Sequence, residues 1–121
     1  MRLLPLALLL GLLPLAPVSA QDVAAGAALF KARCAVCHRS EAGDRPGIGP
    51  NLAGVVGRRA GSAPFVYSDA LKNSRIVWTT KTLNAFLTAP GALVPGTRMV
   101  VEIDDARERA DLVAYLASLR K

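Results

Sequence analysis

The chain has 121 residues, with 15 Lys and Arg against 9 Asp and Glu, and a formal net charge of +6. This length suits one domain and argues against several. Because the charges are dispersed and only 5% of the residues are aromatic, the composition does not indicate a nucleic-acid-binding protein.

Residues 1–20 have the pattern of a secretory signal peptide. Arg2 is basic, an apolar run follows, and the small residues Ser19 and Ala20 end the segment. A membrane anchor is the alternative, but proline and glycine interrupt the run, which is shorter than the roughly 20 apolar residues of a spanning helix. We therefore expect cleavage, which leaves residues 21–121 as a single periplasmic domain of a bacterium with no membrane span.

The first predicted helix covers residues 22–34, DVAAGAALFKARC. Asp22 is suited to the N-cap, because its carboxylate can accept hydrogen bonds from free backbone N–H groups. Gly26 and Phe30 lie one helical turn apart and share a face.

Both cysteines and the only histidine follow within five residues, as CAVCH at 34–38. A disulfide across so small a loop would stabilise the fold only weakly, and a structural zinc site needs about four ligands. A catalytic redox disulfide is expected near a strand–helix–strand pattern, and we predict no strand here. Cys-x-x-Cys-His is the signature of covalent haem attachment, and positions i, i+3 and i+4 of a helical turn share one face. The sequence therefore favours Cys34 and Cys37 as haem attachment sites and His38 as an iron ligand.

Long connections rich in glycine and proline follow, notably residues 40–57, before a second helix predicted over residues 79–89. Threonines can cap its start, and it should stop before Pro90. Loops of this length are unusual in a compact domain, but they suit a chain that wraps around a cofactor. We therefore expect the chain without haem to be largely unfolded.

Met99, in VPGTRMV, is the only methionine of residues 21–121. Pro95 and Gly96 break any helix there, so Met99 lies in a loop that can carry its thioether to an iron atom. A lone methionine more often fills a gap in the core, and the residues alone leave both readings open.

The last predicted helix covers residues 104–121. Acidic residues fall in its first turn, and Arg120 and Lys121 in its last, as the helix dipole favours. Its apolar stripe consists of Leu112, Tyr115, Leu116 and Leu119.

In the order and spacing of several segments, the chain resembles the class I cytochromes c, the small mitochondrial and bacterial type, over nearly all of residues 21–121. The segments are GAALFKARCAVCH, GIGPNLAGVVGRRAG, FVYSDALKNSRIVW, TLNAFLTAPGALVPGTRM and DLVAYLASL. The resemblance implies an all-α cytochrome c fold, in which three to five helices and long loops wrap around one covalently bound haem c. It also implies that a small residue, here Gly26, lets the first and last helices cross closely.

The resemblance also implies roles for nine residues. Cys34 and Cys37 would attach the haem, and His38 and Met99 would be the axial ligands of its iron. The carbonyl of Pro50 would orient His38, and the remaining four would satisfy the haem propionates: Arg58, Tyr67, Trp78 and Thr97. Core packing is the alternative for Tyr67 and Trp78, and a solvated surface for Arg58.

A His/Met haem implies electron transfer, so we expect a monomeric one-electron carrier without catalytic residues. Its donor would be a quinol–cytochrome c reductase or a periplasmic dehydrogenase, and its acceptor a terminal oxidase or reductase. The alternatives are a dedicated electron-accepting subunit of an exported dehydrogenase, and a ligand-binding haem protein that acts as an enzyme or gas sensor.

Two groups of residues depart from the family pattern. Phe86 stands where mitochondrial cytochromes carry a tyrosine that hydrogen-bonds the methionine sulfur, and Leu71 where many carry an asparagine. The ring of basic residues is incomplete, because Arg33 and Arg98 match basic positions while Gly91 and Ala92 do not.

Overall fold

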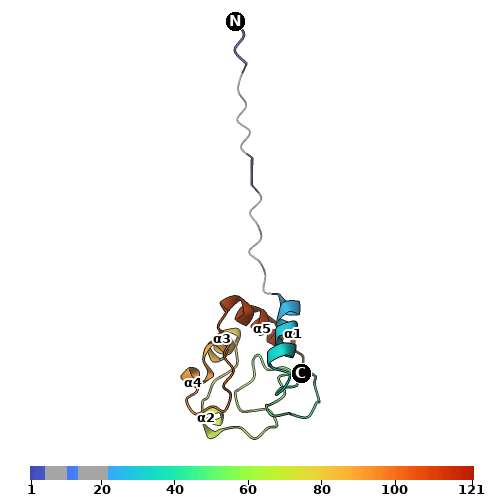
Figure 1. Cartoon of the computed structure of the whole chain (residues 1–121), viewed down its shortest axis with the longest axis vertical. Helices are drawn as coiled ribbons and strands as arrows, with labels where there is room; N and C mark the ends of the chain where they lie inside the picture. The colour runs from blue at the N-terminus through green and yellow to red at the C-terminus, as the bar shows by residue number, and fades with distance from the viewer. Residues whose placement is uncertain (5–10, 14–21) are drawn as a thin grey trace.

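The computed structural model describes residues 1–4, 11–13 and 22–121. Most of the predicted export signal, residues 1–20, lies outside the described residues. In the described part the chain forms five helices and no strand, so the prediction of an all-α fold with three to five helices is confirmed (Figure 1). The helices are α1 (Val23–Arg33), α2 (Asp69–Lys72), α3 (Thr80–Thr88), α4 (Pro90–Leu93) and α5 (Ala106–Ser118).

A side chain caps the start of each of the three long helices. The helices α1 and α3 begin where the sequence predicts, whereas α5 begins at Ala106, two residues after its predicted start. The carboxylate of Asp22 accepts from the N–H of Ala25 at 3.0 Å, and Asp105 accepts from Glu108 at 2.9 Å. At α3, Thr79 and Thr82 form a reciprocal capping box.

The crossing of α1 and α5 is the central contact between helices and forms the upper part of the domain in Figure 1. Gly26 lies at this crossing, and a Cβ built on it would come within 2.6 Å of the Asp111 carbonyl carbon and 2.8 Å of Tyr115 Cβ. Phe30, one turn later, packs on Tyr115 with ring centroids 5.2 Å apart. The expectation that Gly26 lets these helices approach closely is therefore confirmed.

Replacing Gly26 by alanine is expected to lower the free energy of unfolding by about 2 kcal/mol, because the new methyl group forces the two helix backbones apart. Guanidinium titration of the purified protein measures this loss. Gly91→Ala is the matched control, since a Cβ there meets nothing within 4 Å, and we expect it to change stability by less than about 0.5 kcal/mol. Equal effects of the two variants would contradict the close crossing.

The end of α5 differs from the prediction. The helix stops at Ser118, and Leu119 is extended with φ −72° and ψ 128°, so Arg120 and Lys121 lie beyond the last turn. The chain turns away there to cover Gly54, where an added Cβ would lie 3.3 Å from Lys121 Cα. Arg120 and Lys121 therefore do not lie in the last turn of α5, where the helix dipole would favour a positive charge.

The segment between residues 38 and 68 contains no helix and runs around the lower part of the domain in Figure 1. Its one strand-like feature is an isolated antiparallel bridge between Arg59 and Val77. At Arg75, just before this bridge, the backbone takes the left-handed conformation with φ 60°, which is unusual for a residue with a side chain.

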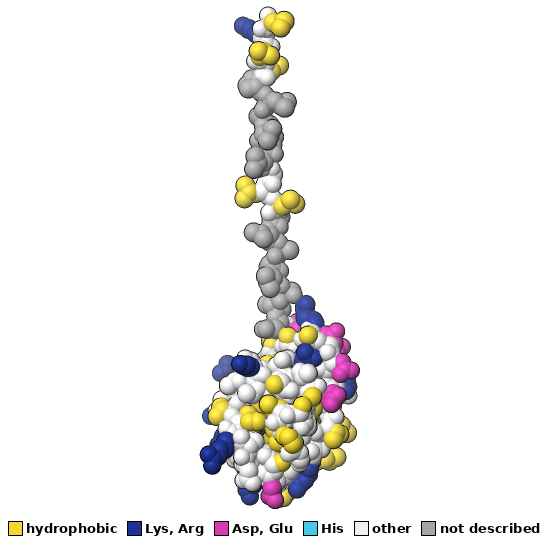
Figure 2. Space-filling view, turned by 90° about the vertical axis from the view of Figure 1, so that its left-hand side faces the viewer, with side chains coloured by type: hydrophobic (Ala, Val, Ile, Leu, Met, Phe, Trp, Pro, Cys, Tyr) yellow, Lys and Arg dark blue, Asp and Glu magenta, His cyan; other side chains and the backbone are white. Residues whose placement is uncertain are grey.

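Charged side chains are unevenly distributed over the surface (Figure 2). On the face in Figure 2, acidic side chains gather near the top of the domain on one side, while Lys and Arg side chains lie apart from one another. Exposed acidic residues occur before and in the first turn of α5, at Glu102, Asp104, Asp105 and Glu108. None of the helices in the described residues has the length and apolar character that crossing a bilayer requires.

Candidate functional site

A cavity of about 370 Å³ lies in the centre of the helical domain. Its lining includes all nine residues to which the family resemblance gives a role: Cys34, Cys37, His38, Pro50, Arg58, Tyr67, Trp78, Thr97 and Met99. Most of the remaining wall is apolar core, with Leu112 completely buried at its back. The structure therefore brings residues from more than half of the chain into one site.

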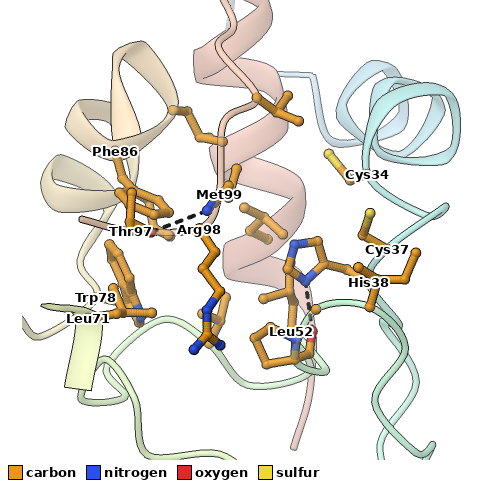
Figure 3. A pocket seen from close by; sticks show the side chains of 18 of the residues that line it. Cys34, Cys37, His38, Leu52, Leu71, Trp78, Phe86, Thr97, Arg98 and Met99 are labelled. Atoms are coloured by element: carbon orange, nitrogen blue, oxygen red, sulfur yellow. Dashed lines mark hydrogen bonds between the residues drawn. The ribbon is translucent and has the colours of Figure 1, made fainter. Parts of the chain in front are cut away.

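The cysteine and histidine side chains come from a single turn at the end of α1. The helix ends at Arg33, but the N–H groups of Cys37 and His38 both donate to the Cys34 carbonyl, at 3.0 and 2.9 Å. This turn keeps the helical spacing, so the two half-buried thiols and the imidazole lie on the same side of the cavity (Figure 3). Cys34, Cys37 and His38 therefore share one face, as expected, and the turn that follows α1 places them there.

The environment of His38 fixes its tautomer. Its Nδ1–H donates to the carbonyl of Pro50 at 2.8 Å, so in the neutral ring Nε2 is the nitrogen that keeps a free lone pair. Burial lowers the pKa of His38, although the Pro50 hydrogen bond acts in the opposite direction. Burial also raises the pKa of the Cys34 thiol, which the charge of Arg33 partly offsets. At neutral pH the site thus holds a neutral imidazole with one nitrogen available to a metal.

Gly49 forms the support behind the imidazole, a role that the sequence did not suggest. A Cβ on this buried residue would lie 2.5 Å from His38 Cε1 and 2.8 Å from Nδ1. Its N–H donates to the Cys37 carbonyl at 2.8 Å. The backbone of residue 49 therefore packs closely against the ring, and a side chain at this position would overlap with the imidazole.

Met99 lies on the other side of the cavity from the CAVCH turn, near Thr97, Phe86 and Trp78 (Figure 3). Its backbone N–H donates to Thr97 Oγ1 at 3.4 Å, and the Thr97 N–H donates to the Val94 carbonyl at 3.0 Å. These bonds hold the turn that carries Met99 between α4 and the segment before α5. Met99 is half-buried, and its thioether thus offers the cavity a further group, besides the His38 imidazole, that can ligate iron.

Arg58 and Tyr67 form the polar end of the cavity. The guanidinium of Arg58 donates to the carbonyls of Ala53 and Asn51 at 3.1 and 3.0 Å. Burial lowers the pKa of Arg58, and the nearby Tyr67 opposes that change. Burial raises the pKa of Tyr67, with Arg58 acting the other way. This end keeps a cation and a hydroxyl close together, as recognition of carboxylates requires.

The inner wall is apolar where the family pattern carries polar groups. Trp78 is only 6% exposed and packs against Phe86, with ring centroids 5.0 Å apart. Leu71 also lines this wall. Phe86 and Leu71, the two residues that depart from the family pattern, therefore line the same cavity as Met99.

These residues fit haem c. Two thiols one turn apart can each form a thioether, an imidazole with a free Nε2 and a thioether can ligate iron from opposite sides, and the apolar walls suit the macrocycle. The Arg58 and Tyr67 end suits its carboxylates. The chemistry of the donor set thus matches one covalently held haem.

Replacing Gly49 by alanine is expected to displace the His38 ring, because the methyl group would occupy the space of Cε1. Overpacking of this kind costs about 1–3 kcal/mol of stability, and it should change the electron paramagnetic resonance spectrum of the ferric haem-loaded protein. Gly91→Ala again serves as the control. A Gly49→Ala protein with the wild-type spectrum would show that the ring tolerates the methyl group.

Sequence comparisons agree with this site. A family model described as Cytochrome c matches residues 23–120. The chain is 49% identical to a cytochrome c of Theileria annulata over 96 residues, which cover 78% of this chain and 84% of that protein. It is 45% identical over 102 residues to a cytochrome c2 of Rhodomicrobium vannielii, with 83% and 81% covered. A cytochrome c2 of Blastochloris viridis is 42% identical over 103 residues, with 84% and 80% covered.

Proposed function

The chain belongs to the cytochrome c family, and on that premise we propose that it shuttles single electrons between redox proteins in a bacterial periplasm, using His38 and Met99 as iron ligands. Family membership makes it an electron carrier with a covalently attached haem c rather than an enzyme. The ligand pair, the cellular compartment and the partners are the proposed part.

The observation that carries the ligand assignment is the placement of His38 and Met99 on opposite sides of one cavity. Bound haem supplies a one-electron couple whose potential methionine ligation raises. His38 is oriented by the Pro50 carbonyl, which also makes its Nε2 a better donor. The buried side chains of Leu112, Trp78 and Phe86 would keep water away from bound haem on the side of the core.

An absorption spectrum of the haem-loaded protein, oxidised and reduced, tests the ligand pair. We expect the ferric protein to show the weak red charge-transfer band of methionine ligation, and the reduced spectrum to be unchanged by carbon monoxide. Rapid carbon monoxide binding without that band would contradict the carrier and favour a ligand-binding haem protein.

The proposed periplasmic location is supported by the signal-like pattern of residues 1–20 and by similarity to bacterial cytochromes c2. Eukaryotic cytochromes c are equally similar, so the N-terminal segment distinguishes the two settings. In a bacterial host that exports and matures c-type cytochromes, the haem-loaded protein should appear in the periplasmic fraction, and its mass should correspond to a chain that begins at Gln21. Protein that keeps residues 1–20 and stays in the membrane fraction would contradict cleavage.

The proposed partners are redox proteins: a quinol–cytochrome c reductase or a periplasmic dehydrogenase as donor, and a terminal oxidase or reductase as acceptor. Val36, Ile48 and Val100 line the cavity and are nevertheless 76%, 76% and 82% exposed. These three side chains mark the mouth of the cavity, through which a partner can come close to the haem edge. Exposed apolar side chains at this place suit contact with the apolar centre of a partner's interface.

A further inference from the structure

The carbonyl group that orients His38 belongs to a segment without helix or strand, residues 49–52. Three hydrogen bonds join this segment to residues 37–39: the Gly49 N–H to the Cys37 carbonyl, the His38 Nδ1–H to the Pro50 carbonyl (Figure 3), and the Leu52 N–H to the Arg39 carbonyl. Asn51 takes part in none of them, and its N–H has no hydrogen-bond partner in the part of the chain that the structure describes. The peptide that carries the Pro50 carbonyl is therefore not held through its own N–H.

The side chain of Asn51 holds this peptide instead. Its Nδ2 donates to the carbonyls of Glu41 and Asp44, at 2.7 and 3.1 Å. Its Oδ1 accepts from the N–H of Ala53 at 2.9 Å. Both N–H donors and the oxygen of the amide are thus in use, and all of their partners are backbone groups. The bond to Ala53 closes a local turn, and the other two tie residue 51 to a separate loop.

The chemistry of these bonds requires an amide. A carboxylate at position 51 would keep an acceptor for Ala53 but would turn negative charge toward two carbonyl oxygens, and alanine would lose all three bonds. The backbone carbonyl of Asn51 also accepts from Arg58 Nη2 at 3.0 Å. Asn51 itself does not line the central cavity. Any influence that it has on the iron therefore passes through its neighbours, and the Pro50 carbonyl is the nearest of them to His38.

We propose that Asn51 is a positioning residue, which fixes the Pro50 carbonyl and thereby sets the hydrogen bond of His38 and the reduction potential of the bound haem. This inference rests on the proposed ligation of iron by His38. A well-placed carbonyl at Nδ1–H makes Nε2 a stronger donor, which stabilises the ferric state more than the ferrous state. When the carbonyl is displaced, the potential rises. A clamp that only stabilises the loop around Glu41 would leave the potential unchanged.

Asn51→Ala removes the three side-chain bonds and tests the proposal in the haem-loaded protein. We expect the equilibrium constant for reduction to increase about threefold, which is a rise in potential of roughly 30 mV at 59 mV per tenfold. Spectroelectrochemistry measures it. In nuclear magnetic resonance spectra of the ferrous protein, the Nδ1–H proton of His38 should also exchange with solvent faster than in the wild type, because its hydrogen bond is weaker.

Gly43→Ala is the matched control, because it disturbs the loop that Asn51 holds without changing residue 51. Gly43 has a φ of 87°, where a residue with a Cβ is strained, although that Cβ would meet nothing within 4 Å. We expect a lower guanidinium midpoint, with the potential and the His38 exchange rate of the wild type. A potential that rises as far in Gly43→Ala as in Asn51→Ala would overturn the proposal in favour of a loop clamp.

Asn51→Ser covers the case in which the alanine variant does not fold around haem. The serine hydroxyl can still accept from the Ala53 N–H, but the two amide donors are lost. We expect its potential to lie between those of the wild type and the alanine variant, with faster exchange of the His38 proton. A serine variant with the potential and exchange rate of the wild type would refute the positioning role.

The outcomes separate this inference from the proposed function. Ring resonances of His38 that have the same shifts in the ferric and ferrous wild type would refute iron ligation by His38 itself. A wild type in which these resonances do shift, together with an Asn51→Ala variant of unchanged potential and exchange rate, would refute only the positioning role of Asn51.

Discussion

Met99→Ala is expected to turn this carrier into a protein whose reduced form binds carbon monoxide immediately after mixing. The chain has one histidine and, after Met1, one methionine, so no second residue of either type can replace the lost ligand. The reduction potential should fall by roughly 0.2–0.3 V, a substantial part of the ~0.8 V range over which axial ligands set haem potentials. Spectroelectrochemistry and carbon monoxide titration measure both effects.

Val100→Ala is the control for this exchange. Val100 is the next residue along the chain and is 82% exposed, so trimming it removes apolar atoms from the same segment without touching the proposed ligand. We expect its potential and its carbon monoxide behaviour to match the wild type. A Met99→Ala protein that still resists carbon monoxide would show that another group occupies the iron.

A chain that cannot attach haem, made by Cys34→Ser and Cys37→Ser, is expected to be largely unfolded. The cavity of about 370 Å³ lies against the core rather than at its edge. At roughly 24 cal/mol per Å³, leaving it unfilled would cost about 9 kcal/mol, similar to the whole stability of about 5–15 kcal/mol of a small protein. Because the cavity is partly open to solvent, this figure is an upper bound.

Far-ultraviolet circular dichroism of this double variant, purified without haem, measures the effect. The wild-type chain with attached haem provides the reference for native helicity. Native-like helicity together with a cooperative thermal transition in the double variant would show that α1, α3 and α5 assemble without the cofactor, and the prediction would be wrong.

Local sequence signals predicted the three long helices well. The Asp22 cap, the threonines before α3 and the small residue at position 26 are each readable within a few residues, and the structure places them as expected. The two helices of four residues, α2 and α4, were not predicted individually, because so short a segment carries no periodic pattern.

Features that depend on distant contacts were not readable from the sequence. The end of α5 follows the packing of Lys121 over Gly54, residues 67 positions apart, and no local signal announces it. The same holds for the bonds from Arg33 and Arg98 to backbone carbonyls, since a carbonyl acceptor leaves no trace in the sequence. The close packing of Gly49 on His38 had one weak signal, its place directly before Pro50.

The candidate site was predictable to different degrees. The CAVCH motif indicated its own chemistry, because two thiols and an imidazole within five residues suit haem attachment better than a disulfide or a zinc site. Met99 depended on resemblance, since a lone methionine more often fills a gap in the core. The roles of Arg58, Tyr67, Trp78 and Thr97 stay predictions, although all four line the cavity.

The exposed residues at the mouth of the cavity, Val36, Ile48 and Val100, affect the order in which donor and acceptor can bind. Donor and acceptor both need a short path to the haem, and this mouth, where apolar side chains of the cavity lining are exposed, offers it to both. The two partners must then take turns, so the protein has to leave one before it can meet the other. Very tight binding to either partner would slow electron transfer between them, because the dissociation rate of each complex limits the number of electrons delivered per second.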